Sequence, residues 1–393
     1  MSCYLDFFAA IRYNKGWHFQ ERGIGMKRIL HIVKANIVTF IALLLACVTM
    51  FFVPPDGEYL SYFDFKTLTC LFTVLAVVCA LRGVRFFYTV AEKIIKVFKN
   101  TRAAVIALVY ITFLGSMLIA NDMALLTFLP LGYFVLLRAK QEKYMCVTFI
   151  LQNIAANLGG MLTPFGNPQN LYLYNKFAIP DGEFVWIMLP LFLLSVAMIT
   201  LACIVFVKPE PIDFVGIEKK LPRVRVAIYL VLFALSVFCV FRFIPYQVAL
   251  VTVPMVILFM DRRALANVDY GLLLTFVFFF IFSGNLARIE PVRALFSALL
   301  DKSTLLVSTL SCQFMSNVPS AILLSQFTDN YRELLMGVNI GGCGTLISSL
   351  ASLITFREYT LHNPGKAGKY LLIFSAFNFS FLAALLAFSF LFV

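Results

Sequence analysis

Long runs of apolar residues alternate with short polar segments along most of this chain. A helix that crosses a bilayer needs roughly 20 predominantly apolar residues, because each residue adds about 1.5 Å across a hydrocarbon layer about 30 Å thick. By this criterion the pattern predicts an all-α polytopic membrane protein with about nine crossings. The expected crossings are residues 32–53, 65–81, 144–178, 184–207, 226–243, 246–260, 270–283, 333–356 and 370–393.

Four further stretches are apolar but do not read as single crossings. Residues 84–100 and 286–302 place charged residues beside apolar ones at helical spacing, and we expect them to lie along the membrane surface. Residues 103–137 and 305–327 are each interrupted near the middle by a polar turn. The first of these is flanked by basic residues on both sides, so it should begin and end on the cytoplasmic side. We interpret both as re-entrant helical hairpins, with Asn121 and Asp122 at one tip and Ser316 and Asn317 at the other.

The crossing at 144–178 contains a string rich in glycine, proline and amides, N-L-G-G-M-L-T-P-F-G-N-P-Q-N, from residue 157 to residue 170. Unpaired backbone groups cost several kcal/mol each in lipid, so a broken helix persists only where it is buried in protein or lines a polar cavity. The residues expected to break this helix are Gly159, Gly160, Pro164 and Pro168. The residues expected to contact an ion or small anion are Thr163, Gly166, Asn167, Gln169 and Asn170.

The second half of the chain repeats this string. Residues 339–353 read N-I-G-G-C-G-T-L-I-S-S-L-A-S-L, and five of the fifteen positions are identical to residues 157–171. Two interrupted segments at corresponding places in two halves are the best sequence indication of a transporter binding site. The second break is expected at Gly341 and Gly342, and its candidate binding residues are Thr345, Ser348 and Ser349.

The basic residues predict the orientation of the chain, because cytoplasmic loops of membrane proteins are enriched in lysine and arginine. The polar linker at 208–225 is expected in the cytoplasm, with the N-terminus also cytoplasmic and the C-terminus outside. Residues 26–207 and 226–393 then form two repeats of opposite orientation. Residues 1–25 are polar, and we expect them to be a cytoplasmic segment or to precede a native start at Met26. Three basic residues fall on the expected outer side and oppose this assignment: Arg288, Arg293 and Lys302.

Composition agrees with a membrane protein and excludes several other classes. Hydrophobic residues make up 61% of the chain and charged residues 13%, which leaves too much apolar surface for a soluble fold. The net charge of +12 lies in short loops and is a topology signal, not a nucleic-acid footprint. The nine cysteines form no CxxC pair, and the three histidines lie outside the middle of any crossing. We therefore do not expect an enzyme, and we expect no cofactor other than a sodium ion, whose candidate site is described next.

Asp122 is the acidic residue that we place deep in the membrane. A carboxylate there is costly and indicates function by default, so it could bind a proton or a sodium ion. Alternatively it caps the second helix of the hairpin, where the helix dipole favours negative charge. Helix N-termini with neutral donors suit an anion, whereas unwound carbonyls and a carboxylate suit Na+. A sodium site is expected near Asn121, Asp122 and Asn317.

The polar strings together resemble the ion transporter superfamily. They are A-N-D-M-A-L-L-T-F-L-P from Ala120, the first break from Asn157, S-N-V-P-S-A-I-L-L from Ser316 and the second break from Asn339. The group includes divalent anion/sodium symporters, citrate transporters, arsenite pumps and sodium/proton antiporters. The chain is most similar to small bacterial inner-membrane permeases with a citrate-transporter-like domain. The resemblance implies a scaffold domain that dimerises and a transport domain that moves like an elevator.

The hairpin tips differ from those of the symporters, which carry paired Ser-Asn-Thr motifs that bind carboxylate and sodium. Here the tips read A-N-D and S-N-V, and the A-N-D is similar to the arsenite pumps. We expect a secondary transporter in the bacterial cytoplasmic membrane that moves a small carboxylate or oxyanion together with H+ or Na+. The alternatives are arsenite-type oxyanion efflux and Na+/H+ antiport; a passive channel would not need two inverted broken helices.

Overall fold

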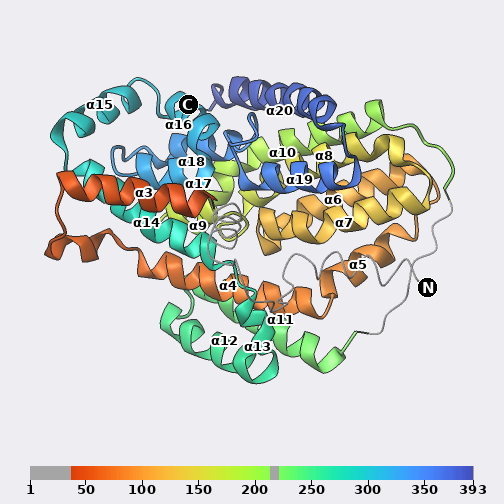
Figure 1. Ribbon diagram of the computed structural model, residues 1–393, viewed down its shortest axis with the longest axis horizontal. Coiled ribbons are helices and arrows are strands. Elements are labelled where there is room, and N and C mark those ends of the chain that lie inside the picture. Colours follow the sequence, from red (N-terminus) through yellow and green to blue (C-terminus); the bar gives the residue numbers. More distant parts are fainter. Residues whose placement is uncertain (1–36, 213–220, 393) are drawn as a thin grey trace, which may run out of the picture.

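The computed structural model describes residues 37–212 and 221–392, and these residues are almost entirely helical (Figure 1). The predicted polar N-terminal segment, the first residues of the first crossing and the middle of the linker lie outside the described residues. The helices of the first half are α3 (Ile37–Phe52), α4 (Phe65–Gly83), α5 (Phe86–Ile95), α6 (Thr101–Ile119), α7 (Asn121–Arg138), α8 (Met145–Gly159), α9 (Pro168–Lys176) and α10 (Asp181–Phe206). Those of the second half are α11 (Arg223–Val240), α12 (Tyr246–Met260), α13 (Arg262–Ala266), α14 (Tyr270–Ala287), α15 (Glu290–Leu300), α16 (Thr304–Met315), α17 (Asn317–Leu324), α18 (Tyr331–Ile340), α19 (Leu350–His362) and α20 (Ala367–Ser389).

Seven helical segments within 37–212 and 221–392 are long and apolar enough to cross a membrane, and the bent pair α15 and α16 would make an eighth. Two shorter apolar helices, α3 and α12, accompany them. The protein is therefore a multi-pass membrane protein, as the hydropathy pattern predicts. The segment Glu142–Leu162 lies in the interior, since 83% of its apolar window is buried, against 28% in α10 and in α20.

Local sequence explains where many of these helices begin. Asp64, Asn100, Asp269 and Ser303 precede α4, α6, α14 and α16, and each accepts a hydrogen bond from a backbone N–H of the first turn. Such caps satisfy donors that would otherwise lack partners at a helix start. Near the membrane these donors have few alternatives, so the polar residues between apolar runs set the helix boundaries.

Two helix pairs reverse direction at a single residue. Ala120 joins α6 to α7 with φ 62° and ψ 152°, and Ser316 joins α16 to α17 with φ 76° and ψ 160°. The members of each pair pack against each other, and α6 and α16 also pack against α8 and α18 respectively. These backbone angles are otherwise almost confined to glycine, and a side chain there costs about 1–3 kcal/mol. The surrounding packing must therefore enforce both turns.

The contacts between the two halves of the chain come in corresponding pairs of helices. Helix α3 packs along α14, whereas α4 packs along α12. In the same way α7 packs against α19, whereas α17 packs against α9 (Figure 1). The amphipathic helices α5 and α15 lie at opposite ends of the molecule, and α15 is bent by 117° from α16. Helices of each half therefore pack against helices of the other half.

Ion pairs show which loops lie together. Arg288, after α14, pairs with Asp56 at 2.7 Å and with Glu58 at 3.4 Å, both in the loop after α3. At a different place Lys143 pairs with Glu210 at 2.7 Å, which joins the loop before α8 to the segment after α10. The Lys143 ammonium, with amide and hydroxyl donors nearby, holds the pKa of Glu210 below its ordinary value. Exposed pairs of this kind add little stability, but they fix the neighbours of each loop.

Candidate functional site

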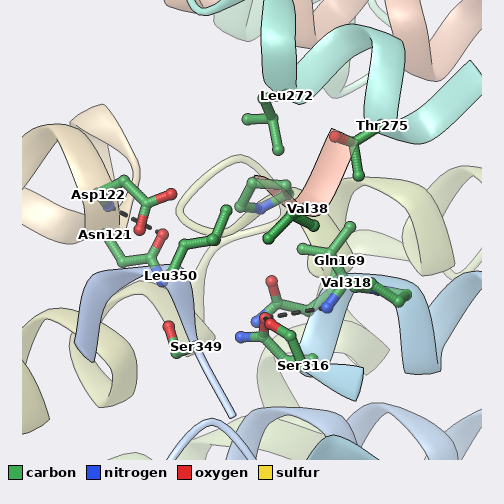
Figure 2. Close-up of a pocket in the computed structure, with 13 residues that line it drawn as sticks. Val38, Asn121, Asp122, Gln169, Leu272, Thr275, Ser316, Val318, Ser349 and Leu350 are labelled. Carbon is green, nitrogen blue, oxygen red and sulfur yellow. Dashed lines mark hydrogen bonds between the residues drawn. The ribbon is translucent and has the colours of Figure 1, made fainter. Parts of the chain in front are cut away.

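Four helix N-termini converge on one small cavity near the centre of the molecule (Figure 2). They belong to α7, α9, α17 and α19. The cavity has a volume of about 20 Å³, which is enough for one water molecule or a similarly small ion. The residues of these four helix starts that line it are Asn121, Asp122, Pro168, Gln169, Ser316, Asn317, Val318, Pro319, Ser349 and Leu350.

Helices α3 and α14 cover the cavity through Val38, Leu272 and Thr275. Figure 2 shows Leu272 and Thr275 on one side and Ser316 and Ser349 on the opposite side. The hydroxyl of Thr275 donates to the carbonyl of Gly271 at 2.8 Å, so the cover presents mainly carbon atoms to the cavity. The local sequence pattern did not point to these three residues, because their position depends on how distant helices dock.

Asp122 is the second residue of α7, and its carboxylate faces the cavity (Figure 2). Its Oδ1 atom is buried without a hydrogen-bond partner among the residues that the structure describes. Its backbone N–H donates to Oδ1 of Asn121 at 3.0 Å, but its own carboxylate accepts no hydrogen bond from the α7 helix start. Asp122 therefore does not act as a hydrogen-bonding cap, although it still lies at the positive end of the helix dipole.

Asn157 connects the first hairpin tip to the second break. Its Oδ1 atom accepts hydrogen bonds from Nδ2 of Asn121 at 3.0 Å and from the hydroxyl of Ser349 at 2.9 Å. Its Nδ2 atom faces the carbonyl of Gly342 at 3.4 Å. A side chain of α8 thereby holds residues of both halves beside the cavity.

Asn339, at the matching place on α18, connects to the first break. Its Nδ2 atom donates to Oδ1 of Asn170 at 2.7 Å, and its Oδ1 atom accepts from Asn167 and Gln169, each at 3.4 Å. Asn157 and Asn339 were not among the residues predicted to form the site. The available signal was their position at the start of the repeated string in both halves.

Two threonines fasten the breaks to the hairpins. The Thr163 hydroxyl donates to the carbonyl of Met117 at 2.8 Å, and the Thr345 hydroxyl donates to the carbonyl of Gln313 at 2.9 Å. Met117 and Gln313 each lie four residues before the asparagine of their hairpin tip. Because these hydroxyls are committed to carbonyls, they do not face the cavity.

The predicted site residues divide into two groups. Those that line the cavity are Asn121, Asp122, Gln169, Ser316, Asn317 and Ser349. Those that support the surrounding backbone are Thr163, Gly166, Asn167, Asn170, Thr345 and Ser348. In this second group Asn170 donates to the carbonyl of Gly160 at 3.1 Å, and Ser348 donates to the carbonyl of Gly342 at 3.0 Å.

The helix breaks differ in detail from the prediction. Helix α8 ends at Gly159 and α9 begins at Pro168, so these two residues bound the first break and do not lie within it. Gly159 instead permits close packing, since a Cβ there would lie 2.2 Å from the carbonyl oxygen of Phe113. The first break contains Pro164 and follows the short turn Gly160–Leu162. The second break begins at Gly341, the residue that follows the last residue of α18, and includes Gly342.

Most of the chain also matches a known protein family. A model described as citrate transporter matches residues 27–331, which is more than half of the chain. The chain belongs to the citrate transporter family. It is thus a membrane transporter, and the predicted absence of enzymatic function agrees with its relatives.

Two curated relatives are similar to this transporter over most of their length. An uncharacterized transporter of Methanocaldococcus jannaschii is 32% identical over 327 residues, which cover 80% of this chain and 86% of the relative. The inner membrane protein YbiR of Escherichia coli is 28% identical over 316 residues, which cover 78% of this chain and 83% of the relative. Both matches extend across the two halves of the transporter.

Proposed function

We propose that the transporter moves a small carboxylate or oxyanion across the membrane, coupled to H+ or Na+. The observation that carries the proposal is the convergence of four helix N-termini on a cavity that contains Asp122. Helix N-termini attract anions because their backbone N–H groups and dipoles point outward. Among the residues that the structure describes, no arginine or lysine lines the cavity, so neutral donors and dipoles would hold the anion.

The coupling ion would bind beside Asp122. Two cavity-lining residues carry a buried oxygen with no hydrogen-bond partner in the described parts of the chain: Oδ1 of Asp122 and Oε1 of Gln169. Oxygen acceptors of this kind suit a hard cation such as Na+, and a carboxylate alone suits a proton. The same oxygens favour the alternative function, Na+/H+ antiport, in which no anion would be carried. Arsenite-type oxyanion efflux remains the other alternative that the A-N-D motif supports.

The arrangement of helices supports an inverted repeat of residues 26–207 and 226–393, joined by the linker at 208–225. The pairing of α3 with α14 corresponds to that of α12 with α4, and the pairing of α7 with α19 corresponds to that of α17 with α9. The matching turns at Ala120 and Ser316 add to this correspondence. In this proposal the two hairpins, 103–137 and 305–327, re-enter the membrane from opposite sides.

The proposed orientation places the linker in the cytoplasm and the C-terminus outside. The pairing of Arg288 with Asp56 and Glu58 supports it, since it accounts for a basic residue on the acidic outer side. Placement in a bacterial inner membrane is supported by the relative from Escherichia coli. We further propose that α3, α4, α12 and α14 belong to a scaffold that forms a homodimer, against which the hairpins and broken helices move.

A ligand screen followed by transport measurements tests the proposed function. Purified protein is heated with carboxylates, arsenite, sodium and lithium, because a ligand that binds the folded state raises its apparent stability. Proteoliposomes then receive the stabilising anion under an imposed pH or sodium gradient. We expect accumulation that requires one of the gradients. Stabilisation by cations alone, with gradient-driven exchange of Na+ for H+, would replace the proposal with antiport.

A further inference from the structure

A cavity of about 490 Å³ lies at the bend between α15 and α16, and it shares no residue with the cavity at the four helix starts. Figure 1 shows the C-terminal end of α20 close to this bend. Pockets that hold small organic molecules have volumes of roughly 300–1,000 Å³, so this cavity has room for a ligand of that size. Its lining residues are Leu300, Asp301, Lys302, Ser303, Thr304, Leu306, Thr328, Asn330, Glu333 and Phe390.

This cavity lies at the level of the membrane surface. Helix α20 is long and apolar enough to cross the membrane, and its last residue precedes Phe390 in the cavity wall. An apolar stripe leads away from the cavity along one face of α16: Leu306, Leu310 and Phe314 lie four residues apart and are 36%, 56% and 81% exposed. A polar cavity at the end of an exposed apolar stripe matches the arrangement of headgroup and acyl chains in a phospholipid.

Two carboxylates line the cavity, those of Asp301 and Glu333. Oε2 of Glu333 accepts a hydrogen bond from the backbone N–H of Leu305 at 2.8 Å, and its Oε1 accepts from Nδ2 of Asn330 at 2.7 Å. These donors hold the carboxylate in place, and each of its oxygens keeps a further lone pair. Within residues 37–212 and 221–392, no lysine or arginine forms an ion pair with Asp301 or Glu333.

Lys302 and Ser303 bring hydrogen-bond donors to the same cavity. Lys302 is exposed, and its ammonium forms no ion pair with a described residue. The Ser303 oxygen accepts from the backbone N–H of Leu306 at 3.2 Å, but none of the described residues accepts the hydrogen of its hydroxyl group. The cavity therefore presents acceptors for a cationic group and donors for an anionic group side by side.

We propose that this cavity binds the headgroup of a phospholipid with a primary ammonium and a phosphodiester, as in phosphatidylethanolamine. The three N–H donors of the ammonium meet the carboxylates of Asp301 and Glu333, and the phosphodiester accepts from Lys302 and Ser303. The acyl chains lie along the apolar stripe of α16. A trimethylammonium headgroup has no N–H to donate, and a headgroup with a phosphodiester alone leaves both carboxylates without a partner. This inference goes beyond the proposed function, since it does not depend on what is carried.

Short-chain lipids test this inference, with the melting temperature of the full-length protein in detergent as the readout. Dioctanoyl phosphatidylethanolamine is compared with phosphatidylcholine and phosphatidylglycerol of the same chain length, and with soluble glycerophosphoethanolamine. We expect the ethanolamine lipid to stabilise the protein at a concentration about tenfold lower than the other two lipids, because its ammonium alone donates hydrogen bonds to the carboxylates. The soluble headgroup should bind more weakly than the lipid, since it has no chains that bury apolar surface.

Substitutions of the two carboxylates locate the ammonium. Asp301→Asn and Glu333→Gln each remove one charge and keep an acceptor oxygen, and each should bring the ethanolamine lipid close to the choline lipid in effective concentration. Asp329→Asn is the matched control, because Asp329 is exposed in the loop before α18 but does not line the cavity. Melting without lipid shows that each variant folds. Asp301 is exposed, so its variant keeps the test decisive if Glu333→Gln does not fold.

Four results would overturn the inference. Two of them are equal stabilisation by the ethanolamine and choline lipids, and a preference that survives both carboxylate substitutions. Tighter binding of phosphatidylglycerol would instead indicate a site for an anionic lipid held by Lys302. Stabilisation by glycerophosphoethanolamine at the same concentration as the lipid would indicate a soluble ligand. None of these measurements depends on the carried substrate, so the proposed function is tested separately.

Discussion

Ala120 and Ser316 adopt nearly the same left-handed backbone conformation at matching places in the two halves, with φ values of 62° and 76°. Neither residue is glycine, so each Cβ atom is held where side chains are seldom tolerated. The reversal of the chain at both tips depends on this conformation, because it brings the N-termini of α7 and α17 to the cavity.

Ala120→Gly should stabilise the protein. Relief of the strained backbone is worth about 1–3 kcal/mol, and the greater freedom of glycine in the unfolded chain costs about 0.5–1 kcal/mol, so a net gain of about 1 kcal/mol is expected. The measurement is the melting temperature in detergent. Ala103→Gly, in the regular first turn of α6, should lower it. A lower melting temperature for Ala120→Gly would show that the turn is not strained.

Gly160 and Gly342 should respond differently to a single methyl group. A Cβ at Gly160 would lie 2.3 Å from Oδ1 of Asn167, which is itself held in place, whereas at Gly342 the nearest atom would be 3.3 Å away. We expect Gly160→Ala to abolish transport with insertion intact and Gly342→Ala to retain most of it. Gly182→Ala, which meets no atom within 4 Å, serves as the control. Normal uptake by Gly160→Ala would contradict the packing argument.

Asp122→Asn should abolish ion-driven accumulation and leave exchange of substrate for substrate. The substitution keeps the size of the side chain but removes both the charge and the bound proton or cation. Uptake into proteoliposomes under a pH or sodium gradient measures this, with wild type beside the variant. If the variant concentrates substrate as well as the wild type under both gradients, the coupling site lies elsewhere.

Glu210→Gln should make the stability of the folded protein less dependent on pH. Hydrogen bonding from Lys143 lowers the pKa of Glu210 below its ordinary value of 4.5. The ion pair therefore contributes stability above that value, and the contribution is lost as the pH falls through the lowered pKa of the folded state. Wild type should melt at a higher temperature than Glu210→Gln near neutral pH, and the two should converge in acid. Glu142→Gln, next to Lys143 in the loop before α8, is the control. Equal dependence of the melting temperature on pH for all three proteins would argue against a contribution from the Lys143–Glu210 pair.

A reporter that fluoresces only in the cytoplasm, fused after Val393, should remain dark. The expected outer position of the C-terminus follows from the basic residues of the cytoplasmic loops and from the opposite orientation of the two repeats. A fusion within the 208–225 linker should be bright and shows that the reporter functions. A bright C-terminal fusion would rule out the inverted repeat.

Sequence indicates where the helices are interrupted, because glycine, proline and polar residues stand out within apolar runs. The expected hairpin at 103–137 corresponds to α6 and α7 at Thr101–Arg138, with the turn at Ala120. Sequence could not tell which polar side chains face the cavity. Thr163 and Thr345 turn to carbonyls of neighbouring helices, and this depends on tertiary packing that no local pattern records.

For a similar reason, sequence could not predict which residues cover the cavity. Val38 and Leu272 belong to ordinary apolar runs, and only the docking of α3 and α14 brings them over the helix N-termini. Sequence could not predict that Asn157 accepts a hydrogen bond from Asn121 whereas Asn339, at the matching place, accepts from Asn167, because these partners depend on tertiary packing.

The helices that cover the cavity, α3 and α14, contact the four helix starts that form its walls through packing and not through hydrogen bonds in the described parts of the chain. These walls are the N-termini of α7, α9, α17 and α19. No hydrogen bond within residues 37–212 and 221–392 connects α3 or α14 to the four helix starts, since Thr39 and Thr275 bond to each other and to Gly271. The walls, by contrast, are tied together across the halves through Asn157 and Asn339. A displacement of the walls relative to α3 and α14 would therefore break no hydrogen bond to these two helices, and their resistance to it would come from apolar contacts that can re-form after each small step.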